Sequence, residues 1–153
     1  MRMVVAVVGK PRNAALAAVI REYETRAARY WPLDVHEVRE ERASSVSATV
    51  VMQREGERLR DRVLGMRIVA CDPNGKSLKS AEFSAWLQKE RERGRDIAFV
   101  VGGAYGLSQE LLKESSMKLA LAPWTLSHEL ARLVLAEQLY RAGTIIRGEP
   151  YHK

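Results

Sequence analysis

Short apolar runs rich in β-branched residues alternate along this chain with longer segments of helical pattern. The run Ile97–Val101 is apolar at every position, as expected for a strand with both faces covered by helices. The run Met3–Val8 predicts a first strand rather than a signal peptide, because it passes into Gly9-Lys10-Pro11-Arg12 without a small-residue cleavage pattern. The alternation predicts an α/β fold: a mostly parallel sheet with helices on both faces and right-handed crossovers.

The remaining boundaries follow from caps, glycines and prolines. Strands are expected over residues 3–8, 34–38, 66–71, 97–101 and 117–121. Helices are expected over residues 13–30, from one of Ser44, Ser45 and Ser47 to about 63, from Ser80 to 93, from about Ser108, and from Ser127 to 142. Asp72-Pro73-Asn74-Gly75 predicts a turn, and Gly143 is expected to end the last helix. No repeat or linker interrupts the pattern, so one domain over residues 1–153 is expected.

The composition argues against a membrane protein and against a disulfide-bonded one, and it favours a nucleic-acid partner. The 153 residues are 46% hydrophobic and 29% charged, with a net charge of +6, and no apolar run approaches the roughly 20 residues of a membrane helix. The single cysteine excludes an internal disulfide and indicates the cytoplasm. The basic balance favours a nucleic-acid partner, and an arginine-rich solvated surface is the alternative. The basic runs over residues 54–62 and 89–95 are interleaved with acids, which favours solvated helix faces with a few phosphate contacts.

A glycine loop, Gly102-Gly103-Ala104-Tyr105-Gly106, follows the buried strand at 97–101. Glycine lacks a Cβ and tolerates positive φ, so backbone here can approach a ligand closely. The spacing and position do not match the dinucleotide fingerprint, and no phosphate-binding P-loop is present. A tight turn without a ligand is an equal alternative.

The segment from Leu121 to His128 is apolar for a loop and joins the fifth expected strand to the last helix. Such a segment suits a pocket for an adenosine-like ligand, whereas the alternative is a buried connection with Trp124 in the core. His128 stands at the start of the helix, where the dipole favours a neutral imidazole. This position suits a base or a hydrogen-bond orienter, although a lone histidine is more often structural.

The last helix and the C-terminal tail give indications about a second subunit and about RNA as partners. Apolar residues are spread around the helix axis, which favours a second subunit as cover, with a central helix in a monomer as the alternative. In the tail, Tyr151 can stack on a base, and Arg147 or Lys153 can meet phosphate. A frayed terminus is the alternative. No metal site is expected, because the three histidines are far apart in sequence.

Several segments together resemble one bacterial family. They are the glycine loop with the strand before it (99–108), the Leu126-Ser127-His128 segment with residues 132–142, the closing Pro150-Tyr151-His152-Lys153, and near the start Val7-Val8-Gly9-Lys10 and Glu22-Tyr23. In this ordered combination the chain is similar, over its whole length, to the ribosomal RNA large subunit methyltransferase H family of the SPOUT class. Its members methylate N3 of a pseudouridine in 23S rRNA on the assembled ribosome.

The resemblance implies a C-terminal trefoil knot, a homodimer and S-adenosyl-L-methionine as cofactor. By position, it places the cofactor against Cys71, Gly103, Ala122, Pro123, Trp124, Thr125, Leu126 and Ser127. It places His128, Arg132, Tyr151 and His152 on the substrate side, with His128, Tyr151 and His152 expected at the reaction. Together with Arg147 and Lys153 of the tail, Arg132 is expected to contact RNA.

The chain departs from many relatives at two places. Ser127 and Glu129 stand where prolines flank the histidine in those relatives, and Ala104-Tyr105 replaces a Pro-Glu pair, which puts a role for an acid there in doubt. Two other functions fit the same resemblance. One is a non-catalytic ribosome-binding protein of this fold, and the other is a SPOUT methyltransferase acting on tRNA.

Overall fold

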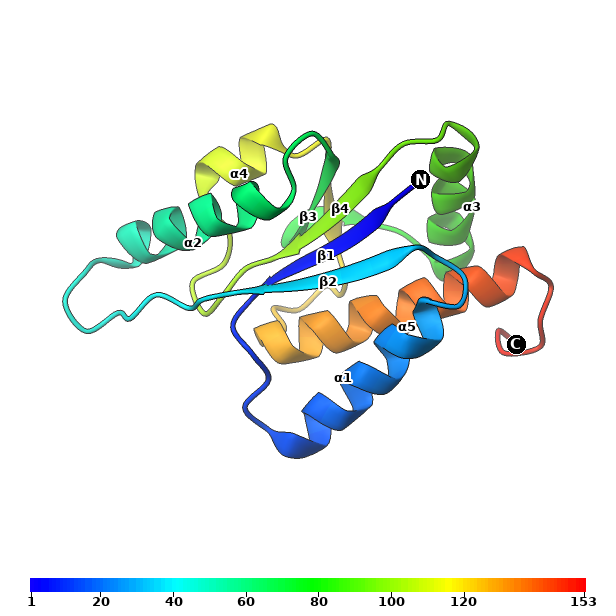
Figure 1. Ribbon diagram of the computed structural model, residues 1–153, viewed down its shortest axis with the longest axis horizontal. Helices are drawn as coiled ribbons and strands as arrows, with labels where there is room; N and C mark the ends of the chain where they lie inside the picture. The colour runs from blue at the N-terminus through cyan, green and yellow to red at the C-terminus, as the bar shows by residue number, and fades with distance from the viewer.

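A five-stranded parallel sheet runs through the computed structural model, which describes residues 1–153 (Figure 1). The strands are β1 (Met3–Val8), β2 (Leu33–Val38), β3 (Arg67–Ser77), β4 (Ile97–Val101) and β5 (Met117–Ala120). They lie in the order β2-β1-β4-β3-β5, and every neighbouring pair is parallel. The predicted α/β class with a parallel sheet is confirmed. The trefoil knot stays a prediction.

Helices cover both faces of the sheet, as expected. Successive strand residues point to opposite faces, so alternate residues of β1 enter two separate apolar clusters. One face is covered by α1 (Ala14–Ala27), α3 (Ser80–Glu92) and α5 (His128–Ile146), and the other by α2 (Ala48–Arg62) and α4 (Gln109–Glu114) (Figure 1). No helix is both long enough and apolar enough to cross a bilayer.

Side-chain caps begin most of the helices where the sequence predicts them. Ser47 caps α2, Ser108 caps α4 and Ser127 caps α5, each by accepting a backbone N–H three residues ahead. The cap expected at Ser80 is wrong. Helix α3 begins after Lys79, whose backbone N–H donates to the Glu82 carboxylate at 2.7 Å, and the Ser80 hydroxyl instead donates to Gln138 of α5 at 2.8 Å.

The turn predicted at Asp72–Gly75 does not end the third strand. β3 continues to Ser77 in the same direction, and Leu119 of β5 pairs with both Cys71 and Lys76. The residues between these two partners form a bulge, in which the Asp72 carboxylate accepts the backbone N–H of Asn74 at 2.8 Å. A bulge uses the same turn-prone residues as a reversal, so local sequence did not distinguish the two.

The last helix runs past Gly143 to Ile146, so the predicted helix end is also wrong. A Cβ added at Gly143 would stand 2.3 Å from Cγ of Tyr30, which follows α1. The glycine therefore permits close packing of the Tyr30 ring on α5, and this packing outweighs its low helix propensity.

Candidate functional site

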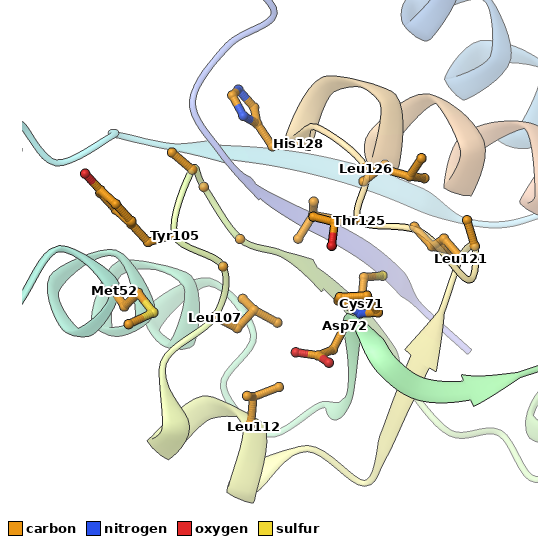
Figure 2. Close-up of a pocket in the computed structure, with 18 of the residues that line it drawn as sticks. Met52, Cys71, Asp72, Tyr105, Leu107, Leu112, Leu121, Thr125, Leu126 and His128 are labelled. Atoms are coloured by element: carbon orange, nitrogen blue, oxygen red, sulfur yellow. The ribbon is translucent and has the colours of Figure 1, made fainter. Parts of the chain in front are cut away.

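A cavity of about 390 Å³ opens at the edge of the sheet where the carboxyl ends of β4 and β5 meet the bulge of β3 (Figure 2). Ligands of open α/β sheets are commonly bound at this edge. We call this space the central cavity. Its lining comes from Met52 of α2, Cys71–Pro73, Val101–Leu107, Gln109 and Leu112, Leu121, Ala122, Trp124–Leu126, and His128 and Ala131 of α5.

The glycine loop folds tightly on itself at the mouth of this cavity. Gly106 has φ +82°, and its N–H donates to the Gly103 carbonyl at 3.0 Å. A Cβ at Gly102 would stand 2.5 Å from the Gly106 carbonyl carbon. The loop is thus a tight turn and at the same time a wall of the cavity, whereas the sequence alone indicated either a turn or a ligand-binding loop.

Cys71 and Asp72 bring the β3 bulge into the cavity. Burial raises the pKa of the Cys71 thiol to about 12, and the adjacent Asp72 carboxylate contributes. The thiol therefore stays neutral and serves as an apolar wall rather than a nucleophile. Figure 2 shows the Asp72 carboxylate directed toward Leu107 and Leu112, so this wall also offers hydrogen-bond acceptors.

The segment before α5 supplies four of its six predicted residues to the lining. Ala122, Trp124, Thr125 and Leu126 line the cavity. The side chain of Trp124 is largely exposed (77%), which excludes the alternative that places it in the core. The other two are not among the lining residues: Pro123 is exposed, and Ser127 caps α5 through Leu130 N–H at 3.4 Å.

His128 is the first residue of α5 and stands at the cavity rim. Figure 2 shows its imidazole beyond the tip of the glycine loop, directed away from Thr125 and Cys71. A ring in this place can reach a second ligand that approaches a molecule already in the cavity.

The two tail residues expected at the reaction lie far from the cavity of the same chain. The Tyr151 hydroxyl donates to Glu137 at 3.0 Å, and Nδ1 of His152 is 3.2 Å from Arg141. Glu137 follows His128 by nine positions on α5, which is about 14 Å along a helix. Burial and the Glu137 carboxylate raise the pKa of Tyr151 well above its ordinary value, so its phenol stays protonated.

Arg132, one of the predicted RNA contacts, is largely buried within this chain. Its side chain is 8% exposed, and its guanidinium pairs with Glu24 of α1 at 2.7 Å and Glu37 of β2 at 2.8 Å. Three parts of the fold therefore meet at this one cation. The other two predicted RNA contacts, Arg147 and Lys153, are both exposed. The Arg147 guanidinium also stacks on Tyr30, with its carbon 4.7 Å from the ring centroid.

Several lining residues were not predicted from the sequence. Met52 and Gln109 enter the cavity only because α2 and α4 pack against the same edge of the sheet, and neither belongs to a recognisable motif. Asp72 belongs to the turn that the sequence predicts, and an acid directly after a buried strand is the one signal that could have marked it as a site residue. No group of three or more histidine, cysteine or acidic side chains has metal-binding geometry.

Comparison with known proteins identifies the family. Residues 1–152 match the family described as "Predicted SPOUT methyltransferase". The chain is 58% identical, over all of both chains, to ribosomal RNA large subunit methyltransferase H of Gemmatimonas aurantiaca, and 44% identical over the same extent to that of an Anaeromyxobacter strain (Fw109-5).

A distant solved structure supports the same fold. The tRNA (m1G37) methyltransferase of Aquifex aeolicus superposes with a TM-score of 0.55 at 13% identity, covering 92% of this chain and 70% of the other. The chain therefore belongs to the SPOUT methyltransferases, and within them to the ribosomal RNA large subunit methyltransferase H family.

Proposed function

We propose that this protein is a cytoplasmic enzyme that methylates N3 of a pseudouridine in 23S rRNA on the assembled ribosome, as a homodimer and with S-adenosyl-L-methionine as methyl donor. One observation carries the proposal. The glycine loop, the β3 bulge and the segment before α5 converge on a single cavity, in a chain that matches an rRNA methyltransferase over its whole length.

The residues of the central cavity fit the proposed donor. Its volume of about 390 Å³ lies within the range of about 300–1,000 Å³ found for small-ligand sites. Apolar side chains such as Leu107, Leu121 and Leu126 would hold the flat ring and the thioether body, and the Asp72 carboxylate would meet hydroxyl or cationic groups. When bound, S-adenosyl-L-methionine supplies an activated methyl group and leaves as a neutral thioether.

The chain's own residues must orient the base and remove a proton. N3 of pseudouridine carries a proton that has to leave before or during transfer, and His128 is the proposed acceptor. It stands at the cavity rim as the first residue of α5, and a neutral imidazole can accept a proton. Tyr151 is better suited to donating a hydrogen bond, because its phenol stays protonated.

A second copy of the chain would complete the site. In one chain the tail with Tyr151 and His152 lies along α5, away from the cavity. Large apolar side chains, meanwhile, are exposed around the cavity: Trp124 at 77%, Tyr105 at 49% and Leu130 at 40%. A dimer across this surface would cover them and bring one chain's tail to the other's cavity.

Mass spectrometry of 23S rRNA from a strain that lacks the gene tests the substrate. Loss of one N3-methylpseudouridine, restored by the wild-type gene, is the expected result. Persistence of the modification would reject the substrate, and loss of a tRNA methyl group instead would favour the tRNA alternative. Calorimetry with S-adenosyl-L-methionine is the second test, since a non-catalytic ribosome-binding protein without a cofactor site should release no heat.

Two variants test the proposed roles within the site. His128→Ala should bind S-adenosyl-L-methionine as the wild type does and lose most turnover, because the cavity walls remain and the base is gone. A chain ending at Pro150 should behave in the same way, and mixing it with H128A protein should restore activity in mixed dimers. Unchanged single-turnover rates for H128A would remove the histidine from the mechanism.

A further inference from the structure

A second cavity lies beside the central one and has no part in the proposed cofactor site. We call it the side cavity. Its volume is about 490 Å³, and Ala104 and Tyr105 of the glycine loop belong to both cavities. Figure 2 shows the Tyr105 ring directed away from Cys71 and Thr125. The two cavities therefore adjoin at the tip of the glycine loop, and molecules bound in them would approach each other there.

Glu55 of α2 lines the side cavity with a buried carboxyl group. The residue is 2% exposed. Its Oε2 accepts the backbone N–H of Glu41 at 3.0 Å, and its Oε1 has no hydrogen-bond partner within the chain. The carboxyl lies directly under the glycine loop, since a Cβ added at Gly103 would stand 2.8 Å from Oε1. A buried polar atom without a partner is costly, so this oxygen indicates a missing partner from outside the chain.

The neighbouring charges leave one cation available. Glu41 pairs with Arg54 and Arg58 on α2, and Glu40 pairs with Arg12 at 2.8 Å. Arg42 also lines the cavity, is exposed, and forms no ion pair within the chain. Around the side cavity therefore lie an unpartnered carboxyl oxygen beneath the glycine loop, an unpaired guanidinium and an exposed aromatic ring, Tyr105. These groups match the polar edge, the phosphate and the face of a nucleotide.

We propose that the side cavity receives the target pyrimidine nucleotide, that Glu55 contacts a ring N–H, and that Arg42 contacts the phosphate. The inference rests on the proposed function and extends it to substrate recognition. In pseudouridine the ribose is attached to carbon, so N1 keeps a hydrogen, whereas in uridine N1 carries the ribose. An acceptor directed at N1–H therefore selects pseudouridine over uridine and leaves N3 free for methylation. Glu55 is a specificity residue, distinct from the proposed base His128.

Burial keeps the Glu55 carboxyl suited to this contact. It raises the pKa of Glu55, and nearby Glu40 acts in the same direction, while the Glu41 N–H and Arg58 oppose it. The unpartnered Oε1 can accept a hydrogen bond whether or not the carboxyl group carries a proton, so it can meet the N1–H of the base. Glutamine presents a carbonyl oxygen as acceptor in the same shape, and leucine presents no acceptor.

The test compares Glu55→Leu with Glu55→Gln on two substrates. These are ribosomes from a strain without this methyltransferase, carrying pseudouridine at the target, and ribosomes with uridine there, from a strain that also lacks the pseudouridine synthase. E55L should lose about 10-fold to 100-fold in kcat/KM on pseudouridine ribosomes and a similar factor in discrimination against uridine. E55Q should retain both within about threefold, and calorimetry should show S-adenosyl-L-methionine affinity unchanged in both variants.

Two substitutions of exposed arginines test the inference if E55L does not fold. Arg42→Ala should raise KM for ribosomes about threefold to tenfold and weaken its salt dependence. Arg62→Ala, which removes an exposed arginine from the far end of α2, should change neither.

Three outcomes would overturn the inference. They are wild-type discrimination in E55L, loss of cofactor affinity in parallel with activity in E55L, and equal behaviour of R42A and R62A. A wild-type protein inactive on pseudouridine ribosomes would instead reject the proposed function.

Discussion

Replacing Gly102 by alanine should open the glycine loop and weaken binding of S-adenosyl-L-methionine. The added Cβ would stand 2.5 Å from the carbonyl carbon of Gly106, 2.7 Å from its oxygen and 2.9 Å from the backbone nitrogen of Leu107. All three are backbone atoms, so no side-chain rotation relieves the overlap. The turn from Gly102 to Leu107 has to move as a unit, and this turn is a wall of the central cavity.

The magnitude follows from the cost of overpacking. Forcing an extra methyl group into a filled site costs about 1–3 kcal/mol. If the bound state needs the native turn, the variant must restore this turn on binding, and the free energy of cofactor binding becomes less favourable by the same amount. Because a factor of ten in affinity corresponds to about 1.4 kcal/mol, the dissociation constant of S-adenosyl-L-methionine should rise about 5-fold to 150-fold.

Calorimetry and urea unfolding at one protein concentration make the measurement, with Gly65→Ala as the matched control. Gly65 has a positive φ, +75°, which Gly102 lacks; no atom lies within 4 Å of its added Cβ, and it does not line the cavity. G65A should lose about 1–2 kcal/mol of stability through backbone strain and keep its cofactor affinity. Wild-type affinity in a folded G102A protein would refute the argument that the loop's closed shape forms the binding wall.

Three further predictions concern buried ionisable side chains. Arg132→Ala should lower the free energy of unfolding by about 3–5 kcal/mol, because Glu24 and Glu37 lose their shared cation; unchanged stability with weaker RNA binding would instead support Arg132 as an RNA contact. The raised pKa of Glu55 means that the folded state holds its proton more tightly than the unfolded state, so this contribution is present in acid and is lost as pH rises through the folded pKa. Wild type should therefore lose stability relative to E55Q as the pH rises above the ordinary glutamate pKa of 4.5, measured in paired urea titrations, and a constant difference would contradict this. Cys71, with a pKa of about 12, should be alkylated by iodoacetamide at pH about 8 far more slowly than a free thiol, and a comparable rate would show an ionised or exposed sulfur.

The sheet was predictable because its strands carry their own signal. Met3–Val8 and Ile97–Val101 were expected at the bounds that the structure has, since strands buried on both faces are apolar at nearly every position. Glycine positions were less informative. Gly106 adopts the positive φ of a turn, whereas Gly143 stands inside a helix to admit Tyr30. The residue type is the same, and only the neighbouring helix distinguishes the two uses.

Local sequence determined the fold class, most helix starts and the two segments that wall the central cavity, because apolar periodicity, caps and glycine spacing act over a few residues. Tertiary structure alone decided which side chains share a site. Packing placed Met52 and Asp72 in the central cavity, enclosed Arg132 between Glu24 and Glu37, and kept the tail away from the cavity of its own chain. These outcomes depend on contacts between residues far apart in sequence, which no local pattern records.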